Sequence, residues 1–407
     1  MNDNLHFTTK KFSYFYLHYL SKYVILIKRG EVSMEKAYKF RIYPNKTQEI
    51  LIQKTFGCVR FVYNYFLDKR ITTYKEDKVT LTYNRCSKEL TKLKQELTWL
   101  KEPDKCSLQN ALKHLDIAFQ NFFNRENVGY PKFKSKKNRH KSYKTSFSNN
   151  NIAFEGSKIK LPKVGKVRIR DKQIPQGRIL NATVSQTPSG KYFVSICCTD
   201  VEKPDFIRTD KYVGIDLGIK DFVITSDGDR YSNPKYLKQS LSKLAKLQRG
   251  LSRKTRGGSN WDKARIKVAR LYERITNQRK DMLNKLSSEL VRKYDVICIE
   301  DLQVSNMIKN HSLAQSISDA SWSEFVRQLE YKSKWYGKEL IKVDKFFPSS
   351  QTCNVCGYIN KATKNLAVRA WICPNCNAKH DRDINASINI LHEGMRTVGT
   401  TGIAQCI

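Results

Sequence analysis

The pattern of hydrophobic and polar positions changes along the chain, and it predicts an α/β protein of several parts. Lys36–Ile42 (KAYKFRI) alternates apolar and polar residues and is followed by Pro44, as in a short strand. Apolar residues recur at helical spacing from Ile50 to Leu67 and again from about Leu108 to Phe123. In the second helix we expect four residues to pack in the core: Leu112, Leu115, Phe119 and Phe122.

Residues 152–198 predict antiparallel strands, because KIKLPKVGKVRIR and ATVSQTPSGKYFVSICC alternate like hairpins around Gly and Pro turns. We expect this small barrel or sheet to pair with the strand at Lys36–Ile42, so that the helices between them form an insertion. Residues 233–290 then predict a long, charged helical pair that is broken at Arg256-Gly257-Gly258. Its apolar stripe consists of Val268, Leu271, Ile275, Met282, Leu286 and Leu290.

Two further apolar segments are predicted strands that each carry an acid. Tyr212–Leu217 (YVGIDL) contains Asp216, and DVICI is followed directly by Glu300. A buried carboxylate is costly unless a cation or a donor satisfies it. Neighbouring strands lie about 4.8 Å apart, so acids at corresponding positions can share a divalent ion.

A third acid lies in HDRDINASINILHE, where Ile384, Ile388 and Leu391 recur at helical spacing. This places Asp383 in the first turn of a helix, from which it can point back at the sheet. Together with Asp216 and Glu300 it would form the carboxylate cluster of a nuclease that uses Mg²⁺ or Mn²⁺. Two neighbouring acids remain open as alternatives, Asp381 for Asp383 and Asp301 for Glu300.

The cysteines predict a structural zinc site. Cys353, Cys356, Cys373 and Cys376 form two CxxC pairs separated by sixteen residues, and four thiolates complete a closed tetrahedral shell. The chain has 11 cysteines, an odd count without a convincing secretory signal, which favours a metal site in a reducing cytoplasm over disulfides. We expect His380 not to be a ligand. The other cysteines are interpreted as small hydrophobic residues: Cys58, Cys86, Cys106, Cys197, Cys198, Cys298 and Cys406.

Charge indicates a polyanionic partner. The 407 residues include 75 Lys and Arg against 38 Asp and Glu, a formal net charge of +37. Nucleic acid is the usual partner of such a chain, and no 18-residue apolar run supports the alternative of a membrane. In residues 129–144 (GYPKFKSKKNRHKSYK) cations alternate with Tyr130, Phe133 and Tyr143, a pattern typical of phosphate contacts combined with base stacking.

Several stretches of the chain resemble the TnpB family (also called OrfB), transposon-encoded RNA-guided DNA endonucleases. They are YKFRIYP, GCVRFVYN, GYPKFKSK, GIDLGIK, IEDL and PSSQTCNVCG…RAWICPNCNAKHDRDINASINIL. The resemblance implies an RNase H-like (RuvC) mixed sheet with an inserted zinc ribbon, and an N-terminal β-barrel wedge domain with an inserted helical domain. Asp216, Glu300 and Asp383 match the family's catalytic positions, and the four cysteines match its ribbon. Target DNA and a transposon-derived guide RNA are the implied partners.

The resemblance also implies domain boundaries. Residues 34–205 would be the wedge, with the helical recognition domain at about 45–128, and 206–350 and 381–395 the two nuclease segments. Residues 351–380 would be the ribbon and 396–407 a tail. Residues 1–33 are interpreted as a leader or a misassigned start, because Met34 begins MEKAYKFRIYP. A cut-and-paste transposase, whose acids usually run Asp, Asp, Glu, and a nuclease-dead RNA-guided repressor are the alternatives.

Overall fold

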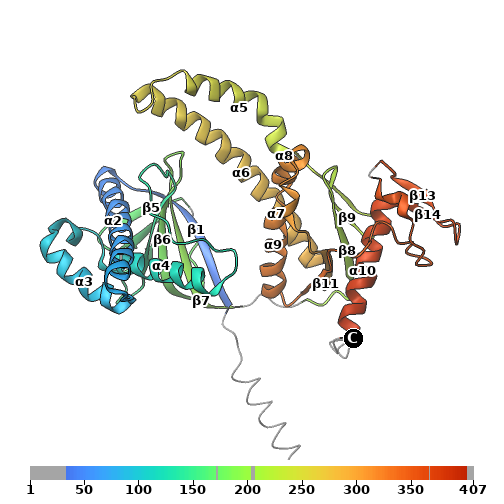
Figure 1. Cartoon of the computed structure of the whole chain (residues 1–407), viewed down its shortest axis with the longest axis horizontal. Coiled ribbons are helices and arrows are strands. Elements are labelled where there is room, and N and C mark those ends of the chain that lie inside the picture. Colours follow the sequence, from blue (N-terminus) through green and yellow to red (C-terminus); the bar gives the residue numbers. More distant parts are fainter. Residues whose placement is uncertain (1–33, 171–172, 203–206, 366, 401–407) are drawn as a thin grey trace, which may run out of the picture. The chain divides into compact units, whose positions relative to one another are not determined.

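The computed structural model describes residues 34–170, 173–202, 207–365 and 367–400. The interpretation of residues 1–33 as a leader, and of Cys406 as a small hydrophobic residue, lies outside these ranges. The chain divides into two compact units, Met1–Glu202 and Lys203–Ile407. Each unit has its own sheet and its own helices (Figure 1).

The first unit is built on an antiparallel sheet with the strand order β2-β6-β7-β1-β5-β4-β3. The N-terminal strand β1 lies between β7 and β5, with Ala37 opposite Cys197 and Ile42 opposite Ile169. The predicted pairing of this strand with the later hairpins is therefore confirmed, whereas closure into a barrel stays a prediction. The strands are β1 (Met34–Tyr43), β2 (Lys141–Ser146), β3 (Ala153–Glu155), β4 (Lys158–Leu161), β5 (Gly165–Ile169), β6 (Arg178–Gln186) and β7 (Tyr192–Val201).

The helices of this unit are inserted between β1 and β2, as predicted. They are α2 (Lys46–Asp77), α3 (Tyr83–Glu96), the 3-10 turn η1 (Thr98–Lys101) and α4 (Lys105–Asn124). Helix α2 begins with a capping box, in which Asn45 and Gln48 satisfy each other's backbone N–H groups. Of the apolar face expected on α4, Leu112 and Leu115 are buried. Phe119 and Phe122 are only partly covered, and both pack against Tyr130 instead of entering the core.

The second unit is built on a mixed sheet with the order β10-β9-β8-β11-β12. Strand β8 pairs in parallel with β11, which pairs in parallel with β12, while β8, β9 and β10 are antiparallel. The strands are β8 (Tyr212–Leu217), β9 (Asp221–Thr225), β10 (Arg230–Ser232), β11 (Val296–Glu300) and β12 (Glu339–Val343). Both apolar strands predicted to carry acids therefore lie next to each other in the middle of this sheet.

The helices of the second unit include the predicted charged pair, α5 and α6, which is interrupted between Ser252 and Ser259. The apolar stripe of α6 changes partners along its length: Val268, Leu271 and Ile275 pack with Leu244 of α5, whereas Leu286 and Leu290 pack under the sheet. Met282 is only partly buried against the same core. The helices are α5 (Tyr236–Ser252), α6 (Ser259–Lys293), α7 (Val304–Met307), α8 (His311–Ala320), α9 (Trp322–Trp335) and α10 (Arg382–Thr400).

Helices cover both faces of the second sheet. Ile215, Ile297 and Ile299 point to the face that packs against α6 and α9. Gly214 faces α10, and it has to be glycine because a Cβ atom there would lie 1.9 Å from the carbonyl oxygen of Ser387. No described helix is long and apolar enough to cross a membrane.

Candidate functional site

Strand alternation brings Asp216 and Glu300 to the same face of the sheet. Ile215 is in register with Ile299 on the parallel neighbour, and each acid is the next residue on its strand. Since side chains alternate between the two faces, Asp216 and Glu300 share the face opposite to that of the two isoleucines. This is the face on which α10 lies, and α10 carries Asp383 in its first turn.

Asp381 is the residue directly before helix α10. Its Oδ1 accepts hydrogen bonds from the backbone N–H groups of Asp383 (3.1 Å) and Ile384 (3.0 Å), as an N-terminal cap does. Its Oδ2 lies 2.9 Å from a guanidinium nitrogen of Arg230. Asp381 thus has a structural role, whereas Asp383 follows in the first turn.

Electrostatics indicate which acids lie close to Asp216. Burial, and then repulsion from Glu300 and Asp383, raise the pKa of Asp216 to about 7, while the nearby Arg382 opposes the rise. Asp301, the alternative to Glu300, is exposed. Burial also raises the pKa of Glu300, an effect that a hydrogen bond from the Ser349 hydroxyl to Oε1 counteracts. Burial and mutual repulsion therefore disfavour the charged form of Asp216, and a cation beside these acids would relieve this cost.

The three carboxylates are near each other but are not drawn together around one point. Among the described residues, the only group of three or more possible ligands whose atoms all lie within 4.8 Å of one another is a cysteine quartet. Instead, both oxygens of Asp383 accept from one guanidinium nitrogen of Arg369, at 3.3 and 3.2 Å. Arg369 therefore supplies the positive charge that Asp383 meets in this structure.

The four predicted cysteines converge in a ribbon that contains η2 (Lys361–Lys364), β13 (Ala370–Ile372) and β14 (Lys379–Asp381). The Sγ atoms of Cys353 and Cys376 are 3.7 Å apart, and those of Cys356 and Cys373 are 3.6 Å apart. Tetrahedral zinc with Zn–S bonds of about 2.3 Å requires sulfur atoms roughly 3.8 Å apart, so the quartet fits this ion. Hydrogen bonds from Asn375 and the Tyr358 backbone lower the pKa of Cys356.

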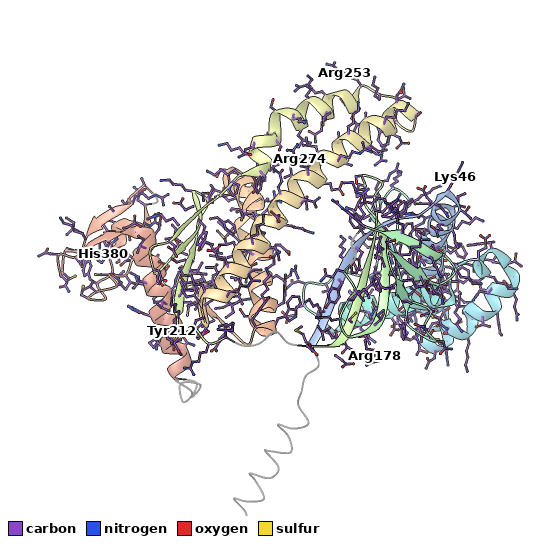
Figure 2. The ribbon with its side chains drawn as sticks, turned by 180° about the vertical axis from the view of Figure 1, so that it is seen from behind. Lys46, Arg178, Tyr212, Arg253, Arg274 and His380 are labelled. Carbon is purple, nitrogen blue, oxygen red and sulfur yellow. The ribbon has the colours of Figure 1, made fainter. Side chains whose placement is uncertain are left out.

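His380 lies beside this quartet without belonging to it. Its Nε2 is 3.0 Å from the Sγ of Cys353, and its ring packs against Trp371 with the ring centroids 4.6 Å apart. Four sulfurs would complete a tetrahedral shell, and the exclusion of His380 as a ligand stays a prediction. Figure 2 shows His380 in the ribbon region of the second unit.

Side chains that the sequence patterns did not single out surround the candidate site. Ser349 contacts Glu300, and Arg369 contacts Asp383. Asn385 and Asn389, on the buried face of α10, hold the segment that leads into the first cysteine pair. A signal for the two asparagines was present, because amides four residues apart in an otherwise apolar helical pattern need buried partners.

The basic segment 129–144 of the first unit has both exposed and buried aromatics. Tyr130 and Phe133 are exposed among the cations, as base stacking requires. Tyr143 is buried and packs edge-on against Phe56, so its predicted role in stacking is wrong. The cause is its position on β2, where alternation turns it towards the helices. The second unit also carries exposed cations along α5 and α6, and Figure 2 marks Arg253, just after α5, and Arg274 on α6.

The fold and the site define an α/β protein with a mixed sheet, a four-cysteine cluster that could hold zinc, and carboxylates near the place where α10 meets the sheet. Residues 195–311 match the OrfB family described as "Probable transposase", and residues 322–390 match the "Cas12f1-like, TNB domain". Residues 34–78 match a "Helix-turn-helix domain", although here they form strand β1 and the single helix α2.

Relatives cover most of the chain. It is 41% identical over 367 residues to a "Putative RNA-guided DNA endonuclease" of Streptomyces pristinaespiralis, which covers 89% of this chain and 90% of the relative. It is 32% identical to "Putative RNA-guided DNA endonuclease InsQ" of Escherichia coli K12, over 88% of this chain and 92% of the relative. A solved Cas12f1-sgRNA-target DNA complex superposes with a TM-score of 0.46 at 14% identity, covering 88% of this chain and 98% of that one. The chain belongs to the TnpB (OrfB) family.

Proposed function

We propose that this protein is a transposon-associated, RNA-guided DNA endonuclease that hydrolyses phosphodiester bonds with the help of a divalent metal ion. Membership of the family and the names of the two relatives support RNA guidance and DNA as the substrate. The net charge of +37 suits a protein that holds both nucleic acids. Base pairing with the guide would supply sequence specificity, while the protein contacts backbone and shape.

The observation that carries the proposed chemistry is that Asp216 and Glu300 share the face of the sheet on which α10 lies, where burial and the neighbouring carboxylates also raise the pKa of Asp216. We assign Asp216, Glu300 and Asp383 as the residues that would hold Mg²⁺ or Mn²⁺. A bound divalent ion would activate water and stabilise the leaving oxygen of the scissile phosphate. Asp216 and Glu300 come from neighbouring strands of one sheet, and Asp383 would have to leave Arg369 to join them around the ion.

The other parts have supporting roles in this proposal. The second unit would be an RNase H-like (RuvC) nuclease with the ribbon as a structural zinc insertion. The first unit would be the wedge domain, a barrel with an inserted helical recognition domain. Residues 129–144 would contact phosphates and stack on bases through Tyr130 and Phe133, which are exposed. The cations of α5 and α6 would bind further backbone.

The proposal is tested by purifying the full chain with the RNA that it retains, sequencing that RNA, and offering DNA that carries the complementary target. We expect cleavage that requires both the RNA and Mg²⁺. Asp216→Asn should abolish cleavage while leaving nucleic-acid binding intact. The matched control is Asp301→Asn, an exposed neighbour of Glu300, which should cleave normally.

The outcomes separate the alternatives. Cleavage by Asp216→Asn would overturn the assignment of the site. Cleavage or strand joining without RNA would favour a transposase, and RNA-dependent binding by the wild type without cleavage would favour a repressor.

A further inference from the structure

The segment that carries the first zinc-site cysteine is held by two side chains of α10. Asn389 Nδ2 donates to the carbonyl oxygens of Ser349 (2.8 Å) and Thr352 (2.6 Å). Asn385 Nδ2 donates to the same Thr352 oxygen (2.7 Å), and its Oδ1 accepts from the backbone N–H of Asn354 (3.0 Å). The two asparagines therefore hold the backbone on both sides of the cysteine between Thr352 and Asn354.

The hydrogen bonds of the two asparagines are strong constraints because they are buried. Asn385 and Asn389 are only 2% and 4% exposed, so a change that broke their hydrogen bonds would leave buried amide groups unpaired. They are four residues apart and share one side of α10. That helix also carries Asp383 in its first turn, and the cysteine segment is thus tied to the element that presents the third acid.

The same segment reaches a second acid directly. The Ser349 hydroxyl donates to Oε1 of Glu300, and Ser349 is itself buried, with its carbonyl oxygen held by Asn389. A carboxylate that accepts a hydrogen bond on one oxygen has its rotation restricted, and its second oxygen is left for another partner. The orientation of Glu300 consequently depends on where the segment between β12 and Cys353 lies.

We propose that the zinc ribbon positions the nuclease site through this segment: zinc held by Cys353 fixes residues 349–354, and Ser349 then orients Glu300 for the divalent ion. Ser349, Asn385 and Asn389 are positioning residues in this scheme. The inference rests on the proposed function, because it takes Glu300 as a ligand of the catalytic ion. It adds that the two metal sites of the second unit are energetically coupled, so that loss of zinc weakens binding of the catalytic ion.

The test measures Mn²⁺ binding by electron paramagnetic resonance on the zinc-loaded full chain, without nucleic acid. Ser349→Ala removes the donor to Glu300, and we expect about tenfold weaker Mn²⁺ binding with one zinc per chain retained, as is usual for the loss of an outer partner of a metal ligand. Ser349→Thr keeps the hydroxyl and should restore binding. The matched control is Ser333→Ala, which removes a buried hydroxyl that has no hydrogen-bond partner among the described residues.

The coupling itself is tested by removing zinc with a zinc-selective chelator. We expect zinc removal to weaken Mn²⁺ binding of the wild type about tenfold, but to have little further effect on Ser349→Ala, because both changes break the same connection. Equal Mn²⁺ affinity of the zinc-loaded wild type and Ser349→Ala would overturn the proposal, even if zinc removal unfolded the ribbon. An equal loss of affinity on zinc removal in both proteins would also overturn it.

Failure of the proposed function would look different. Asp216→Asn should lose Mn²⁺ binding if the carboxylates hold the ion at all. If Asp216→Asn binds Mn²⁺ like the wild type, the assignment of the site is wrong. If binding depends on Asp216 but not on Ser349, only the coupling is wrong.

Discussion

Replacing Asp216 by asparagine should stabilise the metal-free protein at alkaline pH. The folded state raises the pKa of this carboxyl from its ordinary value of 3.8 to about 7. Between these two values the folded protein binds more protons at Asp216 than the unfolded chain does, so the stability contributed by this residue falls as the pH rises. Below pH 3.8 Asp216 lowers the stability of the fold little, because its carboxyl is mostly protonated in both states. Above pH 7 the full loss of stability from its ionisation is present.

The magnitude follows from the separation of the two pKa values. At about 1.4 kcal/mol per pKa unit, the cost of ionising Asp216 in the folded state reaches roughly 4 kcal/mol above pH 7. Asp216 keeps partial exposure to solvent, which screens its charge, so we expect Asp216→Asn to gain about 2 kcal/mol at pH 8. Near pH 4 the gain should vanish, because the wild-type side chain is then also neutral in the folded state.

The assay is urea unfolding of the zinc-loaded, magnesium-free protein at pH 4.5 and pH 8, followed by tryptophan fluorescence. Four of the 5 tryptophans lie in the second unit, so the signal reports mainly on the unit that contains Asp216: Trp261, Trp322, Trp335 and Trp371. Added Mg²⁺ should stabilise the wild type at pH 8 but not Asp216→Asn. If Asp216→Asn is no more stable than the wild type at pH 8, the claim that burial and repulsion raise the pKa of Asp216 is refuted. The same holds if Asp216→Asn is stabilised equally at both pH values. Asp301→Asn is the control and should change stability little.

Three further predictions concern the packing, the cysteine quartet and a buried ion pair of the second unit. Gly214→Ala places a Cβ atom against the α10 backbone and should lower the free energy of unfolding by about 3 kcal/mol, measured by urea unfolding. Gly250→Ala, in open space on α5, should raise the free energy of unfolding by about 0.5–1 kcal/mol in the same assay. Cys353→Ser should release zinc, measured as zinc per chain with a colorimetric chelator, and lower the melting temperature of the second unit. Asp319→Ala leaves Arg279 and the first backbone N–H groups of α5 without their acceptor, and should cost about 3–5 kcal/mol by the same unfolding assay.

Features that depend on spacing along the chain were predicted well. Two CxxC pairs need only short loops to bring four sulfurs together, and the structure has them 3.6 and 3.7 Å apart in two pairs. The pairing of the Lys36–Ile42 strand with the later hairpins was also predicted, from alternation along both segments. The prediction for Tyr143 was wrong, because the basic run around this residue does not indicate whether its strand turns the ring towards solvent or towards the core.

Contacts between distant side chains could not be predicted in the same way. Nothing in the local pattern separates Asp381 from Asp383, yet in the structure the first caps α10 and the second faces Arg369. Ser349 meets Glu300 only because the chain between them forms three helices and a strand before it returns to the same edge of the sheet. Such a pairing is a property of the whole fold, and a hydroxyl in a short polar loop gives no sign of it.

The close spacing of the ribbon and the third acid along the chain has a physical reason in this structure. Helix α10 presents Asp383 in its first turn and holds the backbone around Cys353 through Asn385 and Asn389, two and six residues further on. Because one rigid helix carries both functions, a shift of the ribbon has to move the acid or break buried hydrogen bonds. Ser349, held by the same helix, extends this connection to Glu300 on strand β11. In this chain the acid and the two asparagines follow the second cysteine pair on one helix, which is the arrangement that the proposed coupling uses.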